Sequence, residues 1–277
     1  MSVINTNVNS LIAQNAVNVN ARSLSKAMEQ LSTGKRINGS KDDAAGLSIS
    51  QIMTAQIRGL NQAVRNANDG ISLLQTADGA MIEQGNMLQR MRELAVQSAS
   101  DTVTTDQKSY LDKEFQQLKL EIDRVGSSTQ WNGQDLLKGT GGSGLGVYNF
   151  QVGANKNQSF SVTIADTSTT TLYSDISASV ITSASAAGDA IGNIDKAIAA
   201  ANTQRATLGA TINRLTYAAD NLSNVSMNTA ASRSRIEDTD YATASTELAR
   251  TQIVQQAATA MLAQANQSPQ SVLALLK

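Results

Sequence analysis

The side chains best suited to chemistry in this 277-residue chain are acidic, and they gather in two short runs, Lys41–Asp43 and Glu237–Asp240. Paired carboxylates suggest a divalent-cation site or general acid–base catalysis. Such sites need more oxygen ligands, or two acids with different environments. Neither run supplies these, so we interpret both as structural charges. The second run is expected at a helix start, where negative charge is favourable beside the helix dipole.

The chain contains no histidine and no cysteine, which removes the usual transition-metal ligands, thiol nucleophiles, disulfides and imidazole catalysis. The glycine-rich run 139–146, GTGGSGLG, lacks the Gly-Lys-Ser/Thr ending of a phosphate-binding loop. We therefore expect no cofactor, no metal site and no enzymatic activity. A net charge of −1 also argues against nucleic-acid binding, which requires a basic face.

Apolar residues in alternating steps of four and three predict long helices that would position any such groups. One stripe starts at Met53 and predicts a helix over roughly 46–99, a second helix follows a capping box at Thr104 and Gln107, and a third starts near 187. The core of a helical bundle is expected at Leu60, Leu74, Leu88, Phe115, Ile122, Ile194, Leu208, Leu215 and Leu222.

The length of the first of these helices predicts an elongated rod, because about 80 Å of helix does not fit a compact globule of this size. Aromatic residues make up only 3% of the chain, which also disfavours a large globular core. The alternative is a helix broken at one of its four glycines, Gly59, Gly70, Gly79 or Gly85, since each interior glycine costs about 1 kcal/mol.

The middle of the chain predicts β-structure. Apolar and polar residues alternate over 148–152 and 160–164, with GANKNQS between them, which is a hairpin pattern. Asn132-Gly133 after Trp131 is a second tight-turn signal. Over 159–185, 14 of 27 residues are Ser or Thr, which predicts an exposed, variable or poorly ordered stretch.

The two ends of the chain are uncharged. Residues 1–21 contain no charged side chain, and in 251–277 the only one is Lys277. Both ends have helical apolar stripes with polar faces of Asn, Gln, Ser and Thr. An unpaired buried ion costs several kcal/mol, whereas hydrogen-bonded amides and hydroxyls are buried at modest cost. We therefore expect helices that order when a crowded assembly buries them. The alternatives are an ordinary two-helix subdomain or frayed tails.

The expected assembly contacts are the apolar positions Val17, Leu24, Met28, Leu31, Val254, Met261, Leu262, Leu275 and Leu276. Six asparagines interrupt residues 1–21, so we predict neither a cleaved signal peptide nor a membrane span there. A membrane-surface helix would need cationic residues on its polar face, and these are missing.

Long stretches of this sequence resemble bacterial flagellin. INTNVNSLIAQNA (4–16), QLSTGKRINGSKDDAAGLSIS (30–50), RGLNQAVRNANDGISLLQTADGAM (58–81) and MRELAVQSASD (91–101) are similar to its N-terminal half. NRLTYAADNLSNV (213–225), RIEDTDYATASTELARTQIVQQAATAMLAQANQ (235–267) and the closing SVLALL are similar to its C-terminal half. Trp131 stands where the family commonly has Phe, and 139–186 is too short for the family's large outer domains.

The resemblance implies a mainly α fold: an elongated antiparallel coiled-coil or helical-bundle rod with a small β-hairpin region and paired N- and C-terminal helices. It implies a terminal domain of 1–44 plus 235–277, a bundle domain of 45–138 plus 187–234, and a short variable region, 139–186.

The function implied is that of a self-assembling subunit of the extracellular flagellar filament. Implied partners are other copies of the chain, an export chaperone, the type III export apparatus, and the filament cap and hook-associated proteins; no nucleic acid or membrane is expected. One alternative is a hook–filament junction protein, which shares flagellin-like ends. Another is a cytoplasmic chemoreceptor-like signalling hairpin, which should carry charged heptad flanks throughout.

The resemblance also implies recognition of the monomer by host Toll-like receptor 5 at the run QRMRELAVQ, residues 89–97. Arginine and glutamate there offer charge-assisted hydrogen bonds around a leucine anchor. The same side chains are expected to serve contacts between subunits in the filament wall. These expected contact residues are Gln89, Arg90, Arg92, Glu93, Leu94, Gln97 and Glu114.

Overall fold

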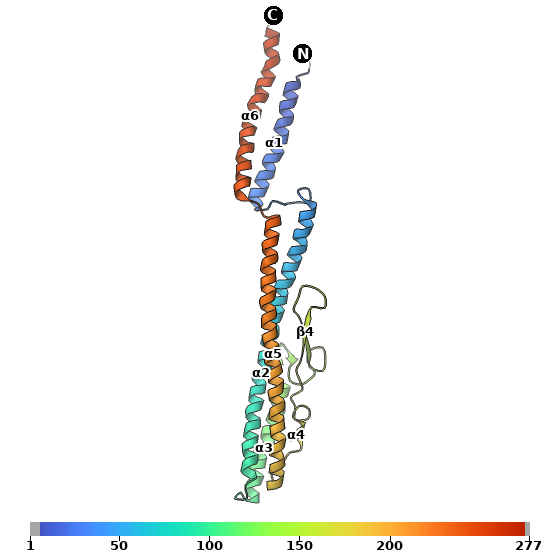
Figure 1. Ribbon diagram of the computed structural model, residues 1–277, viewed down its shortest axis with the longest axis vertical. Coiled ribbons are helices and arrows are strands. Elements are labelled where there is room, and N and C mark those ends of the chain that lie inside the picture. Colours follow the sequence, from blue (N-terminus) through green and yellow to red (C-terminus); the bar gives the residue numbers. More distant parts are fainter. Residues whose placement is uncertain (1–5, 275–277) are drawn as a thin grey trace. The chain divides into compact units, whose positions relative to one another are not determined.

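The computed structural model describes the backbone of residues 6–274 and the side chains of 6–267, and helices make up most of it (Figure 1). The elements in order are α1 (Val8–Thr33), α2 (Ala44–Ser98), α3 (Thr105–Ser128), β1 (Gln130–Trp131), β2 (Gln134–Asp135), β3 (Val147–Gln151), β4 (Ser159–Thr163), α4 (Ser174–Ser177), α5 (Ala184–Glu237) and α6 (Tyr241–Ala274). The predicted mainly α fold with a small β region is confirmed.

The chain divides into two compact units. One consists of residues 58–226, and the other of the described residues within 1–57 and 227–277. Both boundaries fall inside α2 and α5, so each of these helices contributes to both units. The three-part domain division stays a prediction.

Helix α2 runs through 55 residues without interruption, so the hypothesis of a break at its glycines is wrong. At Gly59 and Gly70 the missing side chain makes room for the β-region: a Cβ there would lie 3.0 Å from the Ala154 Cβ or from the Phe150 ring. At Gly79 and Gly85 nothing lies within 4 Å of an added Cβ. Packing along the rest of the helix therefore outweighs the unfavourable helix propensity of glycine.

The core of the 58–226 unit is formed by α2, α3 and α5. The sequence-predicted core positions all lie inside it, with at most 9% of any side chain exposed: Leu60, Leu74, Leu88, Phe115, Ile122, Ile194, Leu208, Leu215 and Leu222. The predicted capping box at the start of α3 is confirmed, since Thr104 and Gln107 exchange hydrogen bonds. It satisfies backbone donors that the first helical turn would otherwise leave unpaired.

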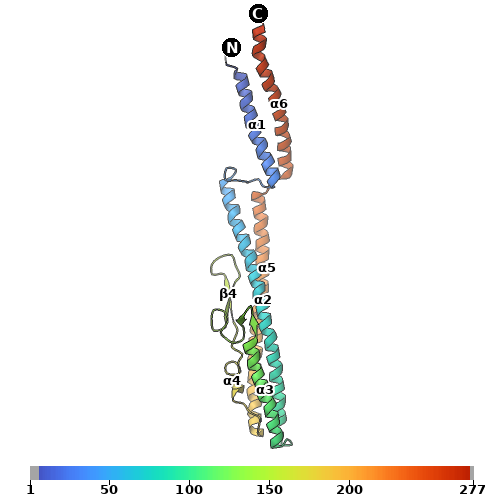
Figure 2. The ribbon, with the colours of Figure 1, turned by 180° about the vertical axis from the view of Figure 1, so that it is seen from behind.

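Both predicted tight turns form antiparallel hairpins. β1 pairs with β2 through a two-residue turn in which Asn132 and Gly133 have φ of 50° and 76°, the signature of a type I′ turn. β3 pairs with β4, with Phe150 opposite Phe160. This second hairpin lies beside α2 and α5 (Figures 1 and 2), where the Arg214 guanidinium covers the Phe160 ring at 4.2 Å.

Most Ser and Thr residues of 159–185 are exposed, as the composition predicts, but some side chains of this stretch are buried in the bundle. Thr167, Thr169 and Ser179 are at most 7% exposed, and Tyr173 and Ile181 are fully buried in the main apolar cluster. The hydroxyls can be buried because each finds a partner.

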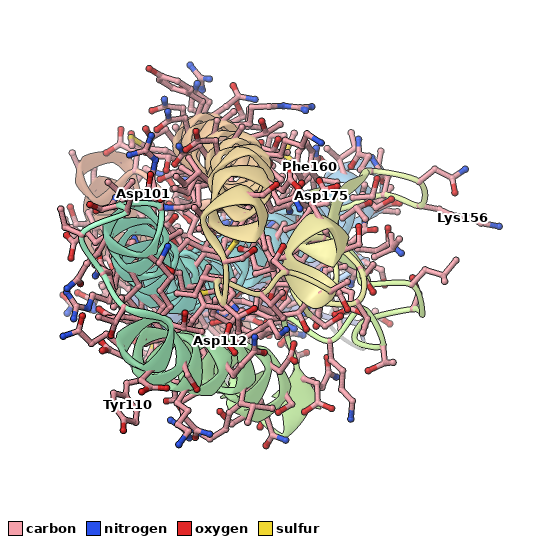
Figure 3. The ribbon with its side chains drawn as sticks, turned by 90° about the horizontal axis from the view of Figure 1, so that it is seen from below. Asp101, Tyr110, Asp112, Lys156, Phe160 and Asp175 are labelled. Atoms are coloured by element: carbon pink, nitrogen blue, oxygen red, sulfur yellow. The ribbon has the colours of Figure 1, made fainter. Side chains whose placement is uncertain are left out.

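Acidic side chains of α3 hold this stretch by its backbone. The Asp123 carboxylate accepts from the Thr169 amide at 2.7 Å and from its hydroxyl at 2.8 Å, and Asp112 accepts from the Ile181 amide at 2.9 Å. Viewed along the helices, Asp112 lies on the side of α3 that faces this segment, whereas Lys156 projects outward from its loop (Figure 3). The segment is thus an integral layer of the bundle.

Candidate functional site

The candidate site begins with the α1–α6 pair, whose helices run side by side in the unit that contains the chain ends (Figure 1). Uncharged polar side chains join them. The Asn7 amide donates to the Ala265 carbonyl at 2.7 Å, and the Asn20 amide donates to the Thr251 carbonyl at 2.8 Å and to Gln255 Oε1 at 2.9 Å. Their order along the two helices shows that the pair is antiparallel.

The pair buries small and polar side chains and leaves its large apolar ones outside. Within α1 only Asn20 and Ala27 are buried, and in the described part of α6 only Ala244 and Thr251 are. The aliphatic and methionine side chains of the pair's described residues with 40% or more of their surface exposed are Val8, Leu11, Ile12, Val19, Met28, Ile253, Val254 and Met261. A concentration of exposed apolar surface on this scale marks an interaction surface.

A shallow groove of about 560 Å³ runs along one face of the pair. Its apolar lining consists of Ile12, Ala13 and Ala16 of α1 and Ala258, Met261 and Ala265 of α6. Ile12 and Met261 are the large side chains of this lining, and both are more than 60% exposed. The groove has the size of a slot for a side chain or a helix ridge from another molecule.

The sequence-predicted assembly residues fall on two sides of this pair. Val17, Leu24, Leu31 and Leu262 are half-buried along the seam, whereas Met28, Val254 and Met261 are exposed. Leu275 and Leu276 lie outside the described residues. Sequence reasoning missed Leu11, Ile12 and Val19 because it followed the heptad seam of α1. The signal for them was an apolar arc wider than one seam in the uncharged stretch 1–21.

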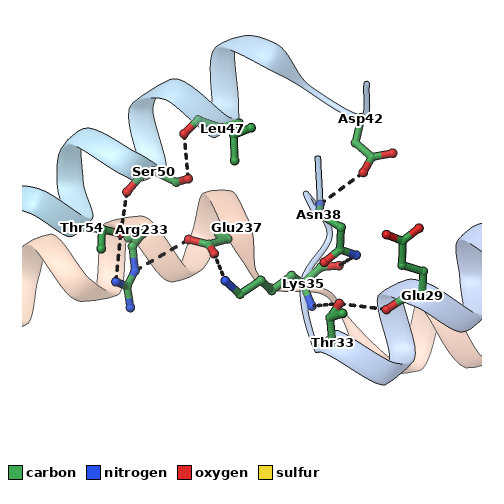
Figure 4. A network of polar contacts seen from close by, with 10 residues as sticks. All are labelled: Glu29, Thr33, Lys35, Asn38, Asp42, Leu47, Ser50, Thr54, Arg233 and Glu237. Atoms are coloured by element: carbon green, nitrogen blue, oxygen red, sulfur yellow. Dashed lines mark hydrogen bonds and ion pairs between the residues drawn. The ribbon is translucent and has the colours of Figure 1, made fainter. Parts of the chain in front are cut away.

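The acidic runs of the sequence lie in the connection between α1 and α2 and at the end of α5 (Figure 4). The Lys35 ammonium pairs with Glu237 at 2.5 Å, and the Glu237 carbonyl accepts from the Arg36 amide at 2.7 Å. Arg233 bonds Thr54 of α2 at 3.2 Å and approaches the Glu237 carboxylate at 3.9 Å. These contacts tie residues 34–37 to the end of α5.

Asp42 stabilises a turn within the same connection. Its carboxylate accepts from the amides of Asn38 and Gly39 at 3.2 and 3.3 Å and pairs with Lys26 at 3.2 Å. The hydrogen bond from Lys26 holds the pKa of Asp42 below its usual value. Asp43 caps the start of α2 by accepting from the Gly46 amide at 2.8 Å.

Asp240 has the same role at the start of α6, where the Thr243 hydroxyl and the Ala242 amide donate to it and lower its pKa. Across the described residues no three acidic side chains converge in a way that could hold a metal ion. The carboxylates of both runs are structural, acting as helix caps and ion-pair partners.

A second polar surface lies where α2 meets α3 and α5. The Arg90 guanidinium donates two hydrogen bonds to Glu114 Oε1, at 2.9 and 3.0 Å, and one to Glu93 at 3.0 Å. Arg92 donates to Asp195 at 2.7 Å. All five side chains are about half-exposed or more. The hydrogen bonds that Arg90 donates to Glu93 and Glu114 raise the pKa of Arg90.

The surface beside this cluster is hollowed. Gln89, Arg92, Glu93, Val96 and Gln97 line a shallow groove of about 520 Å³ along α2. The expectation that Leu94 contributes a surface contact is wrong. Its side chain is fully buried, since it turns inward to pack with Phe115, so it belongs to the bundle core and offers no surface contact.

None of the helices in the part of the chain that the structure describes has the length and apolar character needed to cross a bilayer.

Comparison with known proteins matches the N-terminal and the C-terminal part of the chain to models of one family. Residues 4–141 match the family model of the bacterial flagellin N-terminal helical region, and residues 191–276 match that of the C-terminal helical region. The sequence is 46% identical over 275 residues to a flagellin of Halalkalibacterium halodurans, covering 99% of this chain and 100% of the relative.

Two further relatives agree. The flagellar filament 33 kDa core protein of Treponema phagedenis is 41% identical over 285 residues, covering 99% of this chain and all of that one. Among solved structures, a crystal structure of Bacillus cereus flagellin is 32% identical with a TM-score of 0.50, covering 57% of this chain and 88% of that chain.

Proposed function

Because this chain belongs to the bacterial flagellin family and is a structural subunit of the flagellar filament, not an enzyme, we propose that its α1–α6 pair is the surface that other copies of the chain cover in the filament. The observation that carries this proposal is the exposed apolar surface of a helix pair that has no charges over residues 1–21 or 251–276.

The energetics favour coverage by protein. Fully burying one large aliphatic side chain contributes about 1.5–3 kcal/mol, and eight such side chains are exposed on this pair. Burying a charged helix face would oppose this gain by several kcal/mol for each unpaired ion. The Asn, Gln, Ser and Thr side chains of this pair avoid that cost, and water or neighbouring amides can satisfy them in a crowded interior.

The arrangement also supports a polymer that extends without limit. The groove lined by Ile12 and Met261 and the exposed apolar side chains outside it, such as Val19 and Ile253, are different parts of one molecule. A contact between unlike patches is heterologous, and when its rotation does not close a ring it generates a helical filament.

The test is to introduce one charge at the groove. Ile12→Asp should prevent filament formation after heat dissociation and cooling at high concentration, while leaving the thermal unfolding of the monomer nearly unchanged. The readout is pelletable protein and negative-stain microscopy. Gln117→Glu adds one charge to an exposed position of α3 and is the matched control, which should assemble. Normal filaments from Ile12→Asp would overturn the proposal.

We further propose export without a cleaved signal peptide through the type III apparatus, with an export chaperone binding within 235–277. The growing filament would then contact cap and hook-associated proteins. The exposed apolar side chains of α6 support this, because a weakly buried helix unfolds easily for export and offers a chaperone an apolar face. N-terminal sequencing of secreted subunits tests it, and a cleaved start would contradict it.

A second candidate function is recognition of the monomer by host Toll-like receptor 5 through Gln89, Arg90, Arg92, Glu93, Gln97 and Glu114. The observation in its favour is that these side chains gather beside one groove and remain exposed. Arg90→Ala with Glu114→Ala should lower the response of receptor-bearing reporter cells at equal monomer concentration. An unchanged response would contradict the assignment.

A further inference from the structure

We propose that this chain carries a binding site for neutral saccharides around Trp131, apart from the assembly and receptor surfaces. A groove of about 440 Å³ lies in the 58–226 unit, where the β1–β2 hairpin, strand β3 and helix α2 meet. This volume falls within the range of small-molecule clefts. It is a mixed groove, with aromatic rings and polar side chains on its walls.

The aromatic part suits the apolar face of a pyranose ring. Trp131 and Phe150 are partly exposed in the groove, and Tyr148 closes its floor. The C–H bonds on one face of a pyranose carry partial positive charge, and the face of an indole ring is negative, so the two stack favourably.

The polar part suits sugar hydroxyls. Asp69, Asn132 and Gln134 also line the groove, and within the described residues their side chains make no hydrogen bond. Together they present both donors and acceptors, which a hydroxyl group requires because it does both. One part of the Trp131 ring packs against the apolar cluster of the bundle, and the part that stays accessible lies beside these carboxylate and amide groups.

The groove is held in shape before any ligand arrives. The Tyr148 hydroxyl donates to the Asp135 carbonyl at 2.8 Å, and the Gln130 amide donates to Asp135 Oδ1 at 2.7 Å, so β2 and β3 are fixed to each other. Gly141 packs so closely on Tyr148 that no larger residue would fit. A preformed site loses less conformational entropy on binding.

The charge of the lining sets the ligand class. Of the residues that the structure places along the groove, one is a carboxylate, Asp69, and none is a lysine or arginine. Such a site accepts neutral hexoses and N-acetylhexosamines and repels sialylated or sulfated glycans.

The experiment is a titration of the full-length monomer with cellotetraose, maltotetraose, chitotetraose and lactose. Trp131 is the only tryptophan of the chain, so its fluorescence reports on this groove alone. At least one neutral sugar should shift its emission in a saturable way at millimolar concentration, and 3′-sialyllactose should bind more weakly than lactose.

Variants then locate the site. Asp69→Ala and Gln134→Ala break no hydrogen bond of the free chain and should each weaken binding about threefold to tenfold. Calorimetry should show a loss of about tenfold for Trp131→Phe, which should still assemble into filaments. Gln117→Ala, at an exposed position of α3, is the matched control and should bind as the parent chain does.

Several results would overturn the proposal: no neutral sugar binding at millimolar concentration, equal or stronger binding of the sialylated sugar, or equal binding by Asp69→Ala and Gln134→Ala. If Trp131→Phe fails to form filaments and no sugar binds the parent chain, the groove is a contact between copies. Failure of the assembly test on Ile12 leaves this proposal standing, because the two surfaces share no residue.

Discussion

Several carboxylates of this chain accept hydrogen bonds from backbone amides. Asp42, Asp43 and Asp240 each accept hydrogen bonds from amides at turns or helix starts, and Asp123 and Asp112 bind the backbone of a distant segment. Such contacts need an ionised carboxylate at a precise place but no particular side chain opposite. The sequence analysis interpreted both acidic runs as structural charges, and the contacts of Asp42, Asp43 and Asp240 are of this kind.

Asp42 gives a pH prediction. Its pKa is lower in the folded chain than in the unfolded chain, so its contribution is complete above the unfolded pKa and disappears as the pH falls through the lowered folded pKa. Hydrogen exchange of the Asn38 and Gly39 amides, corrected for intrinsic rates, should therefore accelerate in acid.

The control for this prediction is Asp42→Asn, which should exchange faster at neutral pH and show no acid step. Identical acid profiles for the two chains would contradict the assigned role.

Leu145 provides a stability prediction. It has φ of 55° and is 87% exposed, so a bulky residue holds a left-handed conformation without burying its side chain. Left-handed backbone costs a residue with a Cβ about 1–2 kcal/mol, and glycine avoids this cost while losing more entropy on folding. Leu145→Gly should raise the free energy of unfolding by about 0.5–1 kcal/mol in urea titrations.

Asn157→Gly is the comparison for this prediction. Asn157 also has positive φ, at 67°, but asparagine tolerates that region, so its replacement should gain less. A larger gain at Asn157 than at Leu145 would contradict the explanation.

The sequence predicted the helices more closely than it predicted the other parts of the fold. The alternating stripes and the capping box of Thr104 and Gln107 predicted α2, α3 and α5 to within a few residues, because periodicity and end chemistry are local properties. The burial of part of the Ser/Thr-rich stretch was not predicted, because the α3 side chains that bind this part are 46 and 69 residues away in sequence. Nothing in the local composition records such partners.

The outward apolar face of the α1–α6 pair shows the same limit. Heptad spacing identifies a seam, but α1 has apolar residues beyond one seam, and only the packing shows which of them face the partner helix. The groove at Trp131 was also missed, since it combines residues from α2, β1, β2 and β3 that no single motif contains.

Glycines inside α2 give a prediction for this helix. Gly79→Ala should raise the free energy of unfolding by about 1 kcal/mol, because alanine has the better helix propensity and nothing lies within 4 Å of its new methyl group. Gly70→Ala should gain nothing or lose stability, because its methyl group would lie 3.0 Å from the Phe150 ring. Urea unfolding of the two variants in parallel measures the difference, and equal gains would show that the β3–β4 hairpin does not press on α2.

At the scale of the whole molecule, the two units differ in how much apolar side-chain surface they bury. Residues 58–226 have a well-filled core with buried aromatic and aliphatic side chains, so this unit has its own basis for stability. The α1–α6 pair buries little beyond alanine, asparagine and threonine. If copies of the chain cover the α1–α6 pair as proposed, the surface they cover carries little of the monomer's own stability.

The central claim is that neighbouring copies cover the α1–α6 pair in the filament. The chain has no cysteine, so a single thiol introduced by Ile12→Cys or by Met261→Cys is the only one present. Both side chains are more than 60% exposed in the single chain, and a maleimide should label either thiol quickly in the monomer. In assembled filaments we predict at least a tenfold slower reaction, restored by heat dissociation. Equal labelling rates in monomer and filament would contradict the account.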